Sequence, residues 1–179
     1  MLNLYPPFKF RLLYLALAVG LFLLSFYAGA TIWISPEHAD NIRQELGQRN
    51  KNLDQLGIFA NNLVPSLEMF IPAAGLIIGA YSAVSTGLAF NAFAMANPAL
   101  KSIFPLSLLI SPFAIMEILA YSLAMSRSAI IAYYLVRKPR SWKQSWKKYL
   151  MPTIVEIALV VLVLFIGSVI EWQKISHPT

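Results

Sequence analysis

Apolar runs longer than a membrane is thick constrain this chain more than any other feature. Residues 58–96 are nearly all apolar and would be about 60 Å long as one helix, and residues 103–136 about 50 Å. A bilayer core is only about 30 Å thick, which one helix of residues 11–34 or of residues 150–171 can cross. With 58% hydrophobic and 12% charged residues the chain also lies far from soluble composition. The predicted fold class is therefore all-α, a polytopic transmembrane helix bundle.

Prolines divide the two long runs. Pro65 and Pro72 in the first, and Pro105 and Pro112 in the second, each remove a helix hydrogen bond. The freed backbone groups must be satisfied by neighbouring helices, hydroxyls or cavity water, so broken or re-entrant helices lie inside protein. We expect a single membrane domain over residues 1–179 with four to five membrane segments. Their expected bounds are about 11–34, 60–80, 82–97, 103–136 broken at Pro112, and 150–171.

A short polar helix is expected after the first segment, which is too long for the apolar part of a signal peptide and is predicted to be retained. Ser35 is a good N-cap and Pro36 suits the first helical position, so a surface helix is predicted over residues 36–47, ending at Gly47. This helix is either an amphipathic connector, the favoured reading, or a docking helix for a partner.

The loop before the last run, residues 137–148, contains six basic residues and no acid. The positive-inside rule predicts that this loop is cytoplasmic. Aromatic residues at helical spacing predict an interfacial helix over residues 141–149, which would contact lipid or a partner through Trp142, Lys143, Trp146, Lys147 and Lys148. Five segments would place the N-terminus inside as well, whereas four spans with the N-terminus outside remain an alternative. Nucleic acid is not an expected partner.

Four ionisable residues interrupt the apolar runs: Glu68, Glu117, Arg127 and Glu156. Each costs about 2.5–3.5 kcal/mol at the bilayer centre, so each is expected to face protein and to have a partner. Glu117 and Arg127 are about 15 Å apart along one helix, too far for contact. Arg127 and Glu156 flank the basic loop at similar depth, which predicts an ion pair between their helices. A structural role for this pair is favoured over a proton or ion relay.

Asparagines accompany these charges. Asn61, Asn62 and Asn91 are expected to converge with Glu117 where the broken helices meet, with the Glu117 carboxyl either charged or protonated. The complete predicted polar intramembrane centre consists of Asn61, Asn62, Glu68, Asn91, Glu117, Arg127 and Glu156.

Several kinds of chemistry have no support in the sequence. The chain has no Cys, and its two His residues lie in distant polar flanks, so no metal site and no cofactor are predicted. Ser82 and Ser85 have no intramembrane His or Lys to activate them, so the chain is not expected to be an enzyme.

Four stretches carry a family resemblance: "IFANNLVPSL" at residues 58–67, "TGLAFNAF" at 86–93, Pro112 followed five residues later by Glu117, and "VIEW" at 169–172. In this order and spacing they resemble the SpoIIM-like family of integral membrane proteins. Phe113 and Ala114 replace a His and a Gly of the family pattern, and Ala92 replaces another Gly. The resemblance implies a multi-span membrane scaffold, because the sporulation member recruits peptidoglycan-degrading partners during engulfment.

The predicted function is that of a non-catalytic integral membrane scaffold or subunit that organises partner proteins in a membrane complex. The alternative is a small transporter or channel that uses a polar centre around Glu117 and the broken helices. Expected partners are the lipid bilayer, including anionic lipids, and other membrane proteins in a hetero-complex or homo-oligomer. The expected location is the cell membrane of a prokaryote.

Overall fold

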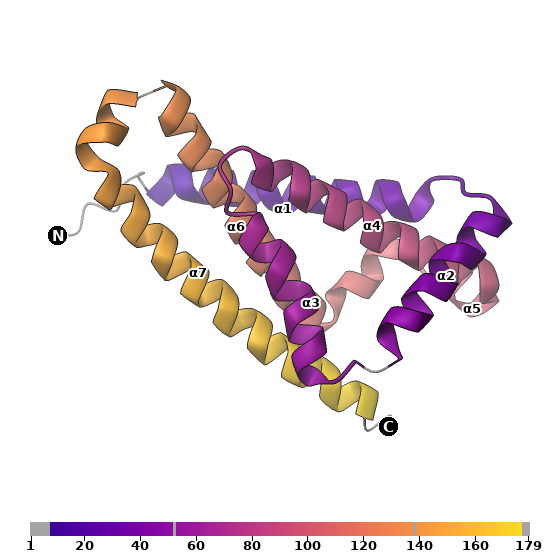
Figure 1. Cartoon of the computed structure of the whole chain (residues 1–179). Coiled ribbons are helices and arrows are strands. Elements are labelled where there is room, and N and C mark those ends of the chain that lie inside the picture. Colours follow the sequence, from indigo (N-terminus) through magenta and orange to yellow (C-terminus); the bar gives the residue numbers. More distant parts are fainter. Residues whose placement is uncertain (1–7, 52, 138, 177–179) are drawn as a thin grey trace.

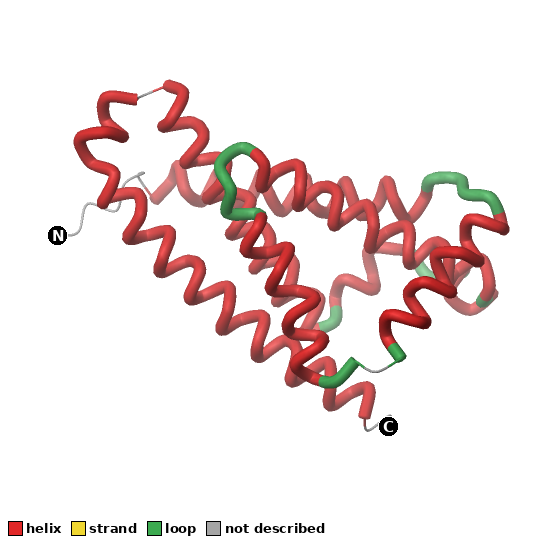
Figure 2. Tube along the Cα trace, viewed as in Figure 1, coloured by secondary structure: helices red, strands yellow, loops and turns green. Residues whose placement is uncertain are grey.

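The computed structural model describes residues 8–51, 53–137 and 139–176, and in these ranges all regular structure is helical (Figure 2). The predicted all-α helix bundle is confirmed. The elements are α1 (Phe8–Thr31), α2 (Pro36–Asn50), α3 (Gln55–Glu68), α4 (Ala74–Ala96), α5 (Pro98–Lys101), the 3-10 helix η1 (Pro105–Ile110), α6 (Pro112–Arg137) and α7 (Pro139–Ser176).

Four helices are long and apolar enough to cross a membrane: α1, α4, α6 and the Tyr149–Ser176 part of α7. Helix α3 has 14 residues. It is therefore only about 21 Å long and cannot cross a bilayer core of about 30 Å. The chain is a multi-pass membrane protein, and α3 is not one of its candidate spanning helices.

Helices α1 and α4 run side by side in the same direction (Figure 1). Their backbones touch at two glycines, because a Cβ on Gly29 would lie 2.2 Å from the Val84 carbonyl oxygen, and one on Gly87 would lie 2.2 Å from that of Phe26. Such close approach through small residues is typical of helix pairs in lipid, where dispersion contacts replace the hydrophobic effect as the driving force.

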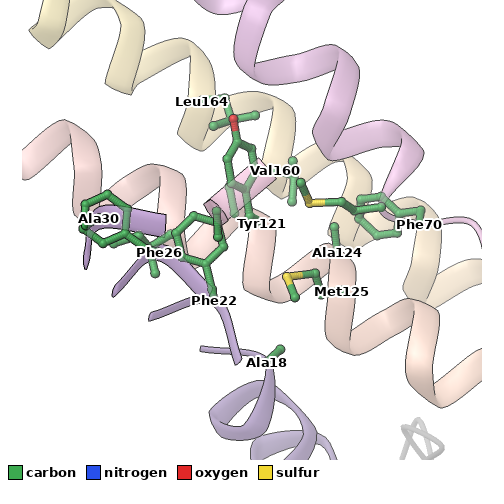
Figure 3. Close-up of a cluster of buried hydrophobic side chains, with 14 residues drawn as sticks. Ala18, Phe22, Phe26, Ala30, Phe70, Tyr121, Ala124, Met125, Val160 and Leu164 are labelled. Atoms are coloured by element: carbon green, nitrogen blue, oxygen red, sulfur yellow. The ribbon is translucent and has the colours of Figure 1, made fainter. Parts of the chain in front are cut away.

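Helix α6 lies at the centre of the molecule and contacts α1, α3, α4 and α7. Its buried residues Tyr121, Ala124 and Met125 pack against Phe22 of α1 and Val160 of α7 in the apolar core (Figure 3). The N-terminal ends of α1 and α7 and the end of α6 lie together, as the 5.8 Å between the Phe10 and Tyr133 ring centroids shows. We name this the loop end; α2 and the end of α7 lie at the opposite end of the molecule (Figure 1).

A break at residues 69–73 returns the chain from α3 into α4. The hydroxyl of Ser128 in α6 donates a hydrogen bond of 2.5 Å to the Ile71 carbonyl oxygen. Ala73 has a φ of 66°, a left-handed conformation that costs a residue with a Cβ about 1–3 kcal/mol. A serine on a neighbouring helix thus satisfies the interrupted backbone, as the prolines led us to expect.

Some helix bounds differ from those predicted. The break expected between segments 60–80 and 82–97 lies at residues 69–73, because Pro72, and not the glycines of α4, interrupts the helix. Helix α2 passes through Gly47 and ends at Asn50, although Ser35 is its N-cap as predicted. Residues 141–149 and 150–171 belong to one helix, α7, which contains Pro152. Helix α6 begins at Pro112, where a break was expected.

Candidate functional site

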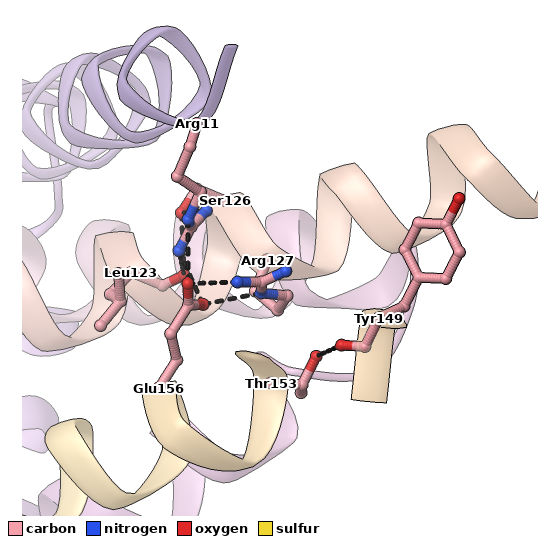
Figure 4. Close-up of polar contacts among 7 residues, drawn as sticks. All are labelled: Arg11, Leu123, Ser126, Arg127, Tyr149, Thr153 and Glu156. Atoms are coloured by element: carbon pink, nitrogen blue, oxygen red, sulfur yellow. Dashed lines mark hydrogen bonds and ion pairs between the residues drawn. The ribbon is translucent and has the colours of Figure 1, made fainter. Parts of the chain in front are cut away.

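Two arginines share one glutamate near the loop end (Figure 4). Arg11 of α1 donates to the Glu156 carboxylate of α7 through Nε (3.0 Å) and Nη2 (2.7 Å). Arg127 of α6 donates to the same carboxylate through Nε (2.7 Å) and Nη2. Arg11 also donates to the Ser126 hydroxyl (2.7 Å) and the Leu123 carbonyl oxygen (3.2 Å). We name Arg11, Arg127 and Glu156 the charged triad.

The charged triad is mostly buried, with side-chain exposures of 15% for Arg11, 3% for Arg127 and 12% for Glu156. The predicted pair between Arg127 and Glu156 is present. Arg11 was not predicted, because a basic residue at the end of an apolar run is typical of an interfacial anchor. The triad carries one positive charge in excess, and Nη1 of Arg127 has no hydrogen-bond partner among the described residues.

A second polar cluster joins α3 to α6. The side-chain amide of Asn62 donates to the Glu117 carboxyl group. The Tyr121 hydroxyl, one turn along α6, donates to the Asn62 side-chain oxygen at 3.3 Å. Glu117 therefore faces protein, and Asn62 fixes the short α3 against the central helix.

The remaining predicted polar residues lie elsewhere. Asn61 accepts a hydrogen bond of 3.1 Å from Arg49 of α2. Asn91 donates to the Ile32 carbonyl oxygen at 2.6 Å, beyond the end of α1. Asn61 and Asn91 thus bond to α2 and to the chain after α1, and Asn62 is the predicted asparagine that the structure bonds to Glu117.

A groove of about 850 Å³ lies between α2, α3 and α4. Its lining is mixed: charged and hydroxyl side chains alternate with aliphatic ones such as Ile42, Val64 and Leu88. Its polar lining residues are His38, Glu45 and Arg49 of α2, Asn61, Asn62 and Glu68 of α3, Tyr81, Ser82, Ser85 and Thr86 of α4, and Tyr121 of α6. Neither His38 nor the groove was predicted, because the α2 sequence shows only a polar helix.

An apolar layer separates the groove from the charged triad. Along α6, Tyr121 lines the groove and Arg127 belongs to the triad. Between them Ala124 and Met125 have no exposed surface, and they pack in the apolar core with Met69 and Val160, which have none either (Figure 3). The two polar regions are therefore not connected in this structure.

A family model described as Stage II sporulation protein M, SpoIIM, matches residues 18–172. The chain belongs to the SpoIIM family. The match covers the groove, Glu117 and Glu156, whereas Arg11 lies before it. Comparisons with curated proteins and with solved structures gave no match.

Other predicted features of this SpoIIM family member remain predictions. The side chains of Trp142, Lys143 and Lys148 lie outside the described residues. Trp146 and Lys147 are exposed near the loop end, with Nζ of Lys147 5.8 Å from the Trp146 ring centroid. Within the described part of the chain, no group of three His, Asp or Glu residues is arranged to hold a metal ion.

Proposed function

We propose that this SpoIIM family protein is a non-catalytic membrane scaffold or subunit that holds partner proteins, with the groove between α2, α3 and α4 as its docking site. The observation that carries the proposal is a groove that is wide, mixed in polarity and separated from the charged triad by a buried apolar layer. A lining of this kind offers both apolar contact and hydrogen-bonding groups to a polypeptide segment.

The apolar layer favours a scaffold over a transporter. A polar solute that entered the groove would meet Met69, Met125 and Val160 before reaching the charged triad. Ionisable residues in transporters mark the solute or proton pathway. Here Glu156 already accepts hydrogen bonds from two arginines, and Glu117 accepts one from Asn62.

Catalysis is the weaker interpretation of the groove. His38 lies in it with Ser82 and Ser85, the residues that a hydrolytic site would need. A nucleophilic hydroxyl requires a base within about 3 Å, and no hydrogen bond joins His38 to either serine. The SpoIIM family is not known as an enzyme family.

In this proposal the loop end is cytoplasmic, which the six basic residues of 137–148 support. The groove, which α2 borders, then faces the outer side of the membrane, and the partner approaches from there. The proposed location is the cell membrane of a prokaryote.

Reconstitution into liposomes tests the proposed function against its alternative. We expect the purified protein to produce no gradient-driven flux of protons, sodium or potassium ions, with protein-free liposomes as the baseline. A flux that is lost in Glu117→Gln, while the folded yield of that variant is unchanged, would show that the chain is a transporter.

A further inference from the structure

Glu68 is one of two acidic residues that line the groove, and neither Glu68 nor Glu45 forms an ion pair with a described residue. Glu68 is the last residue of α3 and is exposed, and its side chain makes no hydrogen bond or ion pair with any described residue. The C-terminal end of a helix carries partial negative charge, so a carboxylate there is unfavourable and a cation is favourable. The fold thus places a negative side chain at a negative helix end.

The depth of Glu68 increases the need for a partner. The next residue, Met69, has no exposed surface, and Ile71 contacts Ser128, which lies within the α6 span. Glu68 therefore lies in the groove at the level of the membrane-spanning helices. Acidic groups at such depth normally pair with a basic group.

The neighbouring charges do not supply that basic group. Arg49 lines the groove but donates to Asn61, and Arg43 on the same helix pairs with Asp40. The second acid of the groove, Glu45, adds negative charge towards α2, and His38 is its other titratable residue. With His38 neutral, the groove has one negative charge in excess.

We propose that the groove receives a Lys or Arg side chain from a segment of a partner protein, and that this cation pairs with Glu68. The inference rests on the proposed scaffold function and specifies the chemistry of its partner. A polypeptide is favoured over a simple cation because a groove of about 850 Å³ far exceeds one ion, and because Ile42, Val64 and Leu88 would contact the flanking apolar side chains.

Site-specific photo-crosslinking in the full chain tests this pairing. Tyr81 lines the groove and is 72% exposed, so a photoreactive residue at this position reaches an occupant without removing a buried group. We expect a polypeptide crosslink whose mapped segment contains a Lys or Arg. In Glu68→Lys the crosslink yield should fall about tenfold or more, and replacing the partner's basic residue by Glu should restore it.

The matched control is Glu37→Lys, the same charge reversal at an exposed residue of α2 that does not line the groove. It should leave the crosslink yield unchanged. Glu68→Gln removes the charge with little change in size, so a lower yield in this variant, with unchanged elution and thermal unfolding, separates loss of pairing from loss of fold.

The outcomes distinguish this inference from the proposed function. A polypeptide crosslink that is equally strong in wild type, Glu68→Gln and Glu68→Lys would overturn the ion pair and leave the scaffold standing. Crosslinks from position 81 to lipid alone, including amine headgroups, would overturn both.

Discussion

Removing the Glu156 carboxylate should damage the fold more than removing either arginine that binds it. The triad carries two positive charges and one negative, so Glu156→Gln leaves Arg11 and Arg127 side by side without an acid. Arg127 is 3% exposed, so little water can replace the lost carboxylate. Breaking a buried ion pair by removing one partner costs about 3–5 kcal/mol. That loss is a large fraction of the whole stability of a typical domain, which is about 5–15 kcal/mol.

The two arginine variants provide the internal comparison. Arg127→Met and Arg11→Gln each leave one arginine paired with Glu156, so charge balance is restored, and the loss should be only about 1–3 kcal/mol. Thermal unfolding midpoints and the folded fraction on gel filtration, measured in one mild detergent, rank the three variants. If Arg127→Met is as damaging as Glu156→Gln, packing around Arg127 and not charge balance governs the triad.

Three further perturbations follow from the contacts. The free energy of unfolding of Glu117→Gln should be within about 1 kcal/mol of wild type, because Gln keeps an oxygen that accepts from Asn62. Glu117→Leu should lose about 1–3 kcal/mol, and equal unfolding midpoints for the two variants would exclude a hydrogen-bonding role. Gly87→Ala should destabilise the protein by about 1–3 kcal/mol, because the added Cβ would meet the backbone of α1. Gly20→Ala is the control, since nothing lies within 4 Å of a Cβ there, and equal effects of the two variants on thermal unfolding would contradict the close helix approach. At Ser141 we expect a fused reporter enzyme that works only in the cytoplasm to be active, and one that works only in the periplasm to be inactive. Activity of the periplasmic reporter would reverse the proposed orientation.

The pair between Arg127 and Glu156 was predictable because depth can be counted along the two helices that flank a short loop. Each residue lies within a span, and the loop brings the adjoining helix ends together. The contribution of Arg11 was not, since the angle at which α1 crosses α6 decides whether its side chain reaches Glu156 or the lipid headgroups. That angle depends on the backbone contacts at Gly29 and Gly87, which no local pattern encodes.

The groove was unpredictable for a related reason. It exists because α3 stops at Glu68 and the chain turns at residues 69–73, which leaves space between α3 and α4 that α2 borders. The prolines indicate that a break exists but do not specify which side of the bundle it opens. Pro65 lies inside α3 without ending it, whereas Pro72 lies at the break, so the position of a proline alone did not fix the helix end.

Glu68, Glu117 and Glu156 are the same residue type in similar apolar sequence, and the fold treats each differently. Glu156 pairs with two arginines, and Glu117 accepts a hydrogen bond from one side-chain amide. The Glu68 side chain has no partner in the described part of the chain and lies in a groove wide enough for a partner's side chain. An acid that the fold has neutralised is explained by stability, because its removal leaves its own partners unpaired. An acid that the fold leaves unpaired at a negative helix end lowers stability, and this cost is the reason for proposing that Glu68 pairs with a cation from outside the chain.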